Sequence, residues 1–309
     1  MFAIIYTLVL LNTIIGNFNV YGSFITKLPA NANTTSAIYL CGGYDGSVYQ
    51  TGCYKYDTRS GDWPPMQPMD TSRAYFGFVA ANKKLYAING WNGKEIVNTV
   101  ESYNTQTNQW KLVASLKNSR DKFDAAVINN TIYVCGGENE DTCEYYLDKN
   151  LWEFSTPMGE KREGLALVSN GAYLYAIGGY DGYNYLSSME RYDPTSRQWV
   201  PMKSMHSTRA FFGAASFKDK IFVCGGHGTG TAICESYDPK LNQWTPIASI
   251  KDKRFDFKLI AFEDELYAFG GYSDYEISDT VEVYNYLADK WAKSKPLPHK
   301  LMDYGVAVL

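Results

Sequence analysis

Short apolar runs that end in a pair of glycines recur along the chain and give the clearest structural signal in the sequence. Residues 38–43 and 174–179 are two examples. Successive positions in these runs are apolar, as expected for strands that are buried on both faces. Each run is followed by a turn-rich loop, a second strand that ends in tyrosine, and a short turn before a tryptophan. This order predicts an all-β chain made of repeated antiparallel units.

Tryptophan and arginine mark the period of the repeat. Six tryptophans fall 47, 42, 47, 45 and 47 residues apart: Trp63, Trp110, Trp152, Trp199, Trp244 and Trp291. An arginine follows each of the first five, twelve residues before the next apolar strand: Arg73, Arg120, Arg162, Arg209 and Arg254. Leu301 takes this place in the last unit. Residues that recur from unit to unit serve what every unit needs, so we assign them structural roles.

At these spacings the glycine pair, tyrosine, tryptophan and arginine resemble the kelch repeat over residues 38–309. The resemblance implies a six-bladed β-propeller of four-stranded antiparallel blades. Because the first unit begins at its second strand, we expect residues 303–309 to complete the first blade and close the ring, which removes an exposed sheet edge. The match departs from the pattern at Asn89, which replaces a glycine, and at a shortened third loop, residues 138–142.

The first charged residue is Lys27, and an apolar stretch precedes it. We predict a secretory signal over residues 1–22, a lead-in over residues 23–37 and the propeller over residues 38–309. The apolar stretch is too short to span a membrane. Its start lacks the usual Lys or Arg, so a buried N-terminal strand or a misplaced start is the alternative. Two sequons make Asn33 and Asn129 candidate glycosylation sites.

All six cysteines fall in two columns of the repeat, one before the glycine pair and one near the start of the second strand. Apolar residues hold these places in the other units, which indicates a cross-strand pair. Adjacent antiparallel strands bring Cα atoms about 4.5–5.5 Å apart, within disulfide range. We predict the disulfides Cys41–Cys53, Cys135–Cys143 and Cys224–Cys234. Reduced, buried thiols are the alternative, because oxidation depends on the compartment.

Charge and motifs exclude several classes of function. The net charge of −4 and the lack of a Lys and Arg cluster argue against nucleic acid as a partner. Some kelch propellers resemble the copper enzyme galactose oxidase, but this chain has only His206, His227 and His299 for such a site. It shows no nucleophile motif and no phosphate-binding loop. We therefore predict no catalytic residue, no metal and no cofactor.

The resemblance to kelch-like adaptors implies that partners bind the face formed by the loops after the glycine pairs and the loops that enter each innermost strand. The residues after the glycine pairs are Tyr44, Trp91, Glu138, Tyr180, His227 and Tyr272. The residues two positions after each repeated arginine, or its equivalent, are Tyr75, Lys122, Gly164, Phe211, Asp256 and Asp303. The same loops add Asp45, Asp181, Tyr183, Asp274 and Tyr275.

These residues make the expected face rich in tyrosine and mostly acidic. Tyrosine and tryptophan dominate interface hot spots, and acidic groups favour a partner with a basic segment. For each aromatic side chain the alternative role is to plug the channel or cover a blade. We predict a secreted protein-binding propeller without catalytic activity. The alternative is a truncated cytosolic substrate receptor that resembles kelch-like adaptors of ubiquitin ligases without the BTB domain; some relatives in that family bind actin.

Overall fold

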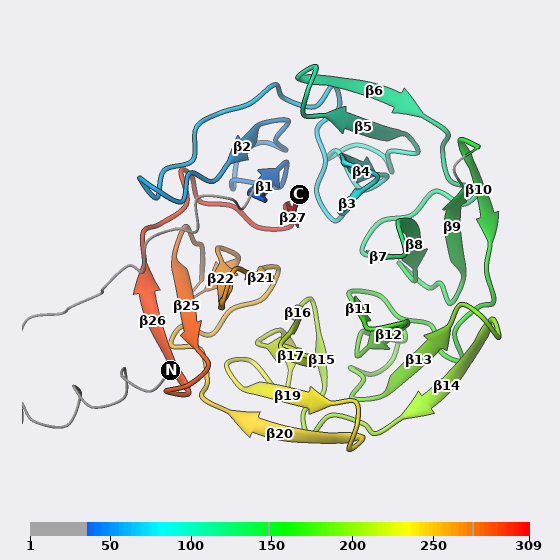
Figure 1. Ribbon diagram of the computed structural model, residues 1–309, viewed down its shortest axis with the longest axis vertical. Helices are drawn as coiled ribbons and strands as arrows, with labels where there is room; N and C mark the ends of the chain where they lie inside the picture. Colours follow the sequence, from blue (N-terminus) through cyan, green and yellow to red (C-terminus); the bar gives the residue numbers. More distant parts are fainter. Residues whose placement is uncertain (1–35, 148, 274) are drawn as a thin grey trace, which may run out of the picture. The chain divides into compact units, whose positions relative to one another are not determined.

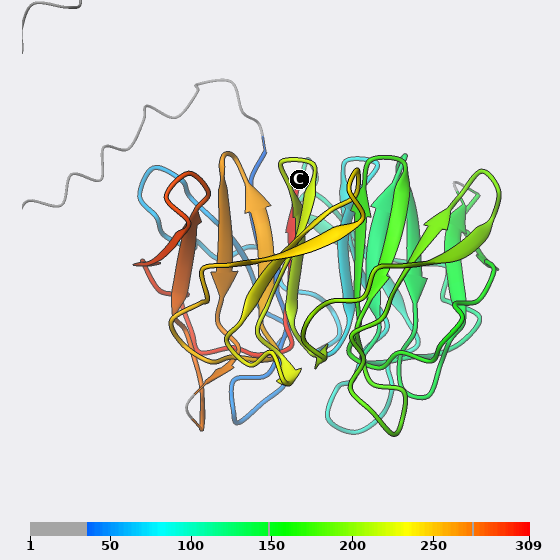
Figure 2. The same cartoon turned by 90° about the horizontal axis from the view of Figure 1, so that it is seen from below.

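The computed structural model describes residues 36–147, 149–273 and 275–309, whose six main sheets are arranged radially around a central axis (Figure 1). Figure 2 shows the sheets standing side by side with their connecting loops at two ends. The predicted six-bladed propeller is therefore confirmed. The predicted signal over residues 1–22, Asn33 and Asp274 lie outside the described residues. Within the described chain no helix has the length and hydropathy needed to cross a bilayer.

Blades two to six each contain four antiparallel strands, ordered here from the axis outward. Blade two has β3 (Gly77–Ala81), β4 (Lys84–Ile88), β5 (Val100–Asn104) and β6 (Gln109–Val113). Blade three has β7 (Asp124–Ile128), β8 (Thr131–Cys135), β9 (Cys143–Leu147) and β10 (Leu151–Phe154). Blade four has β11 (Ala166–Asn170), β12 (Tyr173–Ile177), β13 (Met189–Asp193) and β14 (Gln198–Met202). Blade five has β16 (Gly213–Phe217), β17 (Lys220–Cys224), β19 (Cys234–Asp238) and β20 (Gln243–Ile247). Blade six has β21 (Lys258–Phe262), β22 (Glu265–Phe269), β25 (Val281–Asn285) and β26 (Lys290–Ser294).

Blade one joins the two ends of the ring. The C-terminal strand β27 (Gly305–Val308) pairs with β1 (Ile38–Cys41), which pairs with β2 (Cys53–Lys55), so the predicted closure is confirmed. Residues 62–66 lie along the outer side of β2, where the N–H of Lys55 donates to the carbonyl of Pro64 at 3.1 Å. Because Pro64 and Pro65 have no N–H to donate, this segment makes isolated bridges rather than a regular fourth strand.

In blades two to six the repeated arginine is buried and fixes the base of a loop. Arg73 shows the pattern: Nη1 donates to the carbonyl oxygens of Asn89 and Thr99, each at 2.8 Å, and Nη2 lies 2.7 Å from Oε1 of Glu101. Glu101 also accepts the backbone N–H of Asp70. The same ion pair recurs as Arg120–Glu144, Arg162–Glu190, Arg209–Glu235 and Arg254–Glu282. These bonds offset the cost of burying both charges.

Blade one replaces the whole arrangement. Leu301 stands for the arginine and is 2% exposed, and Tyr54 stands for the glutamate. Both belong to the apolar cluster between blades one and six. In blade two Glu101 accepts the N–H groups of Asp70 and Thr71, and Pro298 stands at the position of Asp70, so one of these two donors is missing in blade one. The buried cation, the buried anion and one backbone donor are therefore absent together.

The repeated tryptophans join neighbouring blades. Each tryptophan ring packs against the tyrosine that ends the preceding strand, with ring centroids 4.9–5.1 Å apart. The indole N–H of Trp110 donates to the carbonyl of Gln67 at 3.0 Å, and four other tryptophans make the matching bond: Trp152, Trp199, Trp244 and Trp291. For Trp63 no such bond is present within the described residues.

The cysteine columns meet as the sequence predicts. Cys41–Cys53, Cys135–Cys143 and Cys224–Cys234 lie directly opposite each other on adjacent strands and form disulfides, each with Cα atoms 4.2 Å apart. Ile88 and Val100 occupy the same opposed positions in blade two. The described chain has no free cysteine.

Candidate functional site

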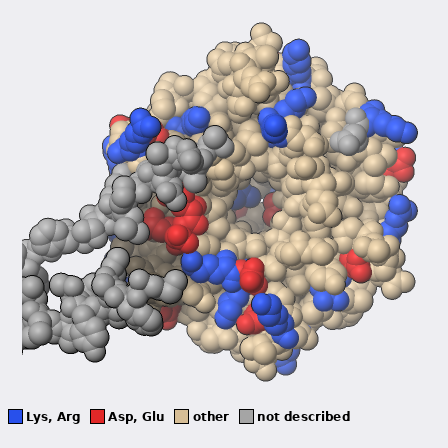
Figure 3. Space-filling view, in the orientation of Figure 1, with Lys and Arg blue, Asp and Glu red and all other residues tan. Residues whose placement is uncertain are grey.

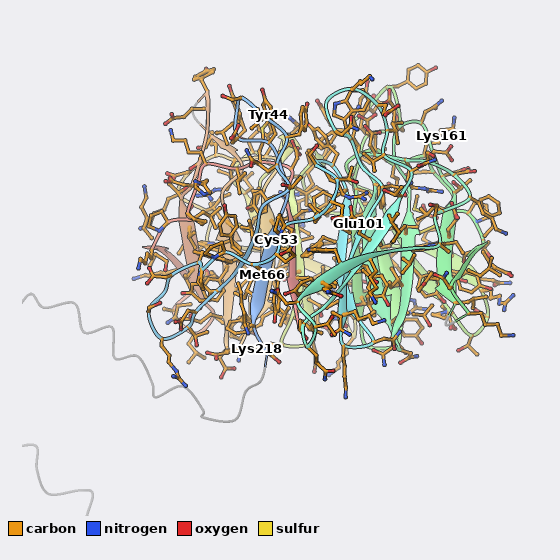
Figure 4. All side chains as sticks on the ribbon, turned by 90° about the horizontal axis from the view of Figure 1, so that it is seen from above. Tyr44, Cys53, Met66, Glu101, Lys161 and Lys218 are labelled. Atoms are coloured by element: carbon orange, nitrogen blue, oxygen red, sulfur yellow. A yellow bond between two sulfur atoms is a disulfide. The ribbon has the colours of Figure 1, made fainter. Side chains whose placement is uncertain are left out.

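The loops after the glycine pairs and the loops that enter the innermost strands gather at one end of the ring, here called the loop face. Figure 4 places Tyr44 and Lys161 at this end and Lys218 at the opposite end, with Cys53 and Glu101 between them. Lys218 belongs to the hairpin between β16 and β17, so the opposite end is called the hairpin face. Asn129, in the hairpin between β7 and β8, is exposed.

The glycine pairs shape the loop face because the chain turns against its neighbours there. Gly42 and Gly43 have φ of 65° and 95°, and a Cβ on either would lie 2.7 Å from an atom of the adjoining loop. Asn89, the predicted departure, keeps the left-handed conformation with φ of 47°. The residue after each pair then leaves the blade toward the loop face.

The predicted residues two positions after the arginines form a ring around the channel mouth, here called the channel ring: Tyr75, Lys122, Gly164, Phe211, Asp256 and Asp303. All six have φ between 51° and 60°. Each N–H donates to the carbonyl of the preceding member, at 2.7–3.1 Å, and the N–H of Tyr75 donates to the carbonyl of Asp303. Six different blades thus contribute one residue each to a closed circle of backbone hydrogen bonds.

The channel ring is partly covered by its own aromatic side chains. The rings of Tyr75 and Phe211 meet edge to face with centroids 6.3 Å apart. Gly164 makes room for this contact, because a Cβ there would lie 2.8 Å from the Phe211 ring. Both aromatic side chains are half-buried. Both line the cavity at the channel mouth, and the alternative role of covering the channel stays a prediction for them.

The predicted residues after the glycine pairs in blades four to six belong to a continuous run of aromatic side chains, here called the aromatic track: Tyr180, Tyr185, His227, Phe255 and Tyr272. Neighbouring ring centroids lie 5.3, 6.1, 3.9 and 5.1 Å apart along this order. Two short sheets hold it, β15 (Arg209–Ala210) with β18 (His227–Gly228) and β23 (Tyr272–Ser273) with β24 (Glu276–Ile277). Burial lowers the pKa of His227, so its ring is neutral at pH 7.

Tyr185 and Phe255 of the aromatic track were not among the residues predicted from the sequence. Phe255 directly follows the repeated arginine of its unit, and its backbone bridges to Tyr272. The position after the arginine is therefore a third column that reaches the loop face, and that spacing could have identified it. Tyr185 pairs across its own loop with Tyr180.

The other predicted residues take three kinds of place. Tyr183 and Tyr275 are 88% and 94% exposed. Tyr44 and Trp91 are half-buried and bridge to neighbouring loop segments, and the ring of Tyr44 lies 4.8 Å from that of Tyr49. Lys122 forms ion pairs with Glu138 at 3.3 Å and with Glu163 at 3.1 Å, so the one lysine of the channel ring is neutralised.

Two predicted acidic residues also shape their loops. Oδ1 of Asp45 accepts the N–H groups of Ser47 and Val48 at 2.7 and 2.8 Å. Asp181 accepts those of Tyr183 and Asn184 in the same way. These backbone donors stabilise the ionised form and lower the pKa of both carboxyl groups. Each keeps its negative charge at the loop face while it holds a turn.

Asp256 and Asp303 are adjacent members of the channel ring. Burial and their mutual repulsion raise the pKa of Asp303 well above its ordinary value, and burial raises the pKa of Asp256 to about 6. Lys258 lies close enough to lower both values but forms no ion pair with either in the described chain. Figure 3, which views the hairpin face, shows a central hollow with acidic and basic side chains inside it. Within the described residues no group of three or more His, Cys, Asp or Glu side chains could hold a metal ion.

Comparisons with known proteins place the repeats. The model of the KLHDC2/KLHL20/DRC7 Kelch-repeats domain matches residues 123–302, more than half of the chain, and the Kelch motif matches residues 32–70 and 72–117. Alpha-scruin of Limulus polyphemus is 26% identical over 64% of this chain and 18% of its own length. Kelch-like protein 26 of Danio rerio is 29% identical over 62% of this chain and 34% of its own length. This chain therefore spans about a third or less of either relative. The solved structure of YjhT has a TM-score of 0.70 with 15% identity, covers 83% of this chain and 97% of its own, and shows the same fold.

Proposed function

Because this chain belongs to the kelch-repeat family, we propose that it is a protein-binding propeller without catalytic activity whose partner binds the loop face. The aromatic track is the observation that carries the proposal. Five rings from three neighbouring blades lie in unbroken contact there. Tyr183 and Tyr275, in the loops of blades four and six, are highly exposed. Rigid, partly exposed aromatic side chains supply most of the binding energy of typical interfaces.

The charges of the loop face favour a partner with a basic segment. Asp45 and Asp181 are ionised at the loop tips, and Lys122 is paired with two glutamates. Complementary charge speeds association and suppresses wrong partners. Asp274, which the sequence also assigns to this face, is part of the same proposal.

A matched pair of variants tests the location of binding. Tyr183→Ala combined with Tyr275→Ala removes two highly exposed loop-face rings, and Phe154→Ala removes a ring that is 50% exposed on the outer strand β10. Proteins captured by the wild type from the source tissue or medium are quantified for all three chains. We expect capture to fall with the loop-face variant and to persist with Phe154→Ala. Equal capture by all three chains contradicts the proposal.

We further propose that the protein is secreted. The three disulfides support this, because such bonds persist in oxidising compartments, and the predicted signal over residues 1–22 agrees. Mass spectrometry of the natural protein tests it: an N-terminus near Ser23 with no free thiol supports export. A retained Met1 with six free thiols contradicts export.

The second candidate is a cytosolic substrate-recognition module of the kelch-like type. The match to Kelch-like protein 26 favours it. Retained Met1 and free thiols in the same mass spectrum would select this candidate. Both candidates place the partner on the loop face, so the capture experiment applies to each.

A further inference from the structure

We propose that the channel mouth binds the ammonium group of a lysine side chain of the partner, held by Asp256 and Asp303 beside the ring of Tyr75. This inference rests on the proposed function, because it names the chemistry of the partner segment that enters the loop face. It adds a specific site to the general expectation of a basic partner.

The backbone of the channel ring fixes the three residues side by side. The N–H of Asp303 donates to the carbonyl of Asp256, and the N–H of Tyr75 donates to the carbonyl of Asp303, both at 3.1 Å. The side chain of Asp303 interacts with the Asp256 carboxyl group and with the Tyr75 hydroxyl. All three line a cavity of about 50 Å³ under the channel mouth. The site is therefore built by the fold rather than by mobile loop tips.

Two carboxyl oxygens in this cavity lack a hydrogen-bond partner apart from the contact between the two carboxyl groups themselves. Asp303 is only 7% exposed, and its Oδ2 is buried and unpartnered, as is Oδ1 of Asp256. A buried carboxylate oxygen without a hydrogen-bond donor has lost its hydration without a replacing hydrogen bond, which costs free energy. A donor with positive charge, supplied by a partner, would satisfy both oxygens at once.

The positive charges near the site do not fill this role. Lys122 is engaged by Glu138 and Glu163 on the other side of Tyr75. Lys258 lines the same cavity but forms no ion pair with Asp256 or Asp303 in the described parts of the chain. The Asp256 carboxylate, ionised above a pH of about 6, therefore has no ion-pair partner among the described residues.

The size and donor set of the site select an ammonium group. Two carboxylates are too few for a typical divalent-cation site in proteins. An ammonium group is a compact charge with three donors on a narrow stem, whereas a guanidinium group is broad and planar. The cavity of about 50 Å³ suits the narrower group. The Tyr75 ring adds a face on which a cation is favoured.

The same geometry makes lysine binding depend on pH. Lys258 on β21 and Lys122 in the loop before β7 line the same cavity as the two carboxyl groups, and Lys258 lowers the pKa of both. The buried carboxyl group of Asp124 on β7 interacts with the same Lys258. Burial raises the pKa of Asp256 to about 6, so the pair holds an extra proton below that pH. An ammonium group binds the form of the pair in which Asp256 is deprotonated, so the affinity for lysine rises as the pH increases through about 6.

The test titrates the full chain with the capped peptide Gly-Lys-Gly and with the same peptide carrying norleucine or arginine in place of lysine. Binding is followed by nuclear magnetic resonance at pH 5 and pH 8. We expect the lysine peptide to bind more tightly than the norleucine and arginine peptides, and more tightly at pH 8 than at pH 5. Asp256→Asn should weaken lysine binding roughly tenfold at pH 8, because Asp256 is the carboxyl group that ionises as the pH rises through about 6 and its charge-assisted bond is lost. The control Asp219→Asn, on an exposed hairpin turn, should leave it unchanged.

Equal binding of the lysine and norleucine peptides, or equal affinity in wild type and Asp256→Asn, overturns the inference. Asp303→Asn is the second variant, and circular dichroism checks that each variant is folded. If the lysine site fails while capture still depends on Tyr183 and Tyr275, the proposed function stands and only this inference falls. If lysine binds as expected while capture ignores the loop-face tyrosines, the proposed function falls and the lysine site stands.

Discussion

Blade one and the other five blades solve the same packing problem with different chemistry. Five blades bury an arginine against a glutamate, and blade one buries Leu301 beside Tyr54. Glu101 also accepts two N–H groups from the preceding loop, and Pro298 removes the first of these donors in blade one. The difference teaches that a buried ion pair is exchanged as a complete set, since any single member left behind would be buried without a partner.

The largest effect on stability is expected from breaking the buried ion pair of blade three. Arg120→Leu leaves Glu144 buried without its cation and should lower the free energy of unfolding by about 3–5 kcal/mol, measured by urea denaturation. Adding Glu144→Tyr and Lys117→Pro to that chain copies blade one and should recover most of the loss. If the triple variant is no more stable than Arg120→Leu, blade one does not owe its stability to this exchange.

Removal of the disulfide in blade one tests the closure of the ring. Cys41→Ala with Cys53→Ala should cost about 3 kcal/mol, since the bridge no longer restricts the unfolded chain. The disulfide Cys224–Cys234 in blade five closes a loop of similar length, so Cys224→Ala with Cys234→Ala should lower the free energy of unfolding by a similar amount. Thermal denaturation of both variants provides the comparison. A much larger loss for blade one shows that the disulfide also holds the seam between the chain ends.

The acidic pair lies where the loops entering blades six and one meet, and its expected effect on stability depends on pH. The folded-state pKa of Asp256 is raised to about 6. The contribution of its protonated form to the stability of the folded protein is therefore complete below the ordinary pKa of an aspartate and is lost as the pH rises through about 6. Asp256→Asn should therefore stabilise the protein at pH 7.5, by at most about 3 kcal/mol, and little at pH 4. Urea denaturation at both pH values checks this against Asp219→Asn. A gain that is the same at both pH values contradicts it.

The smallest expected effect concerns the tryptophans. Trp110→Phe loses the bond to the carbonyl of Gln67 and should cost about 1 kcal/mol more than Trp63→Phe, whose indole makes no such bond in the described chain. Both substitutions remove similar apolar area, so each serves as the control for the other. Equal losses in urea denaturation would show that packing against tyrosine, rather than the hydrogen bond, is what joins the blades.

The sequence predicted the features that depend on the repeat alone. The tryptophan spacing predicted the six blades, and the unpaired C-terminal strand predicted the closure of the ring. The two cysteine columns predicted the disulfides. The structure contains all three features. The partner of the arginine was missed, although Glu101 and its four equivalents directly follow the second cysteine column or its apolar counterpart. A column of identical charge inside an apolar strand was the available signal.

The arrangement of the candidate site was less accessible from the sequence. The contact of Phe255 with His227, and that of Tyr75 with Phe211, join residues from different units, so no spacing within one unit encodes them. The left-handed conformation of six dissimilar residues in the channel ring is likewise imposed by neighbouring blades. Local propensity favours it at Gly164 but gives no warning of it at Tyr75 or Phe211.

The circle of backbone bonds at the channel mouth fixes the bore of the opening and leaves its chemistry to side chains. Each of the six residues donates its N–H to one neighbour and accepts a hydrogen bond at its C=O from the other. These backbone groups therefore bond to one another rather than to a molecule in the channel. A substitution at any of the six positions changes the side chain at the channel mouth without removing a backbone donor or acceptor of the circle, unless the new residue is proline. The backbone of the channel mouth is thus the same for any such set of six side chains, and the side chains alone set its chemistry.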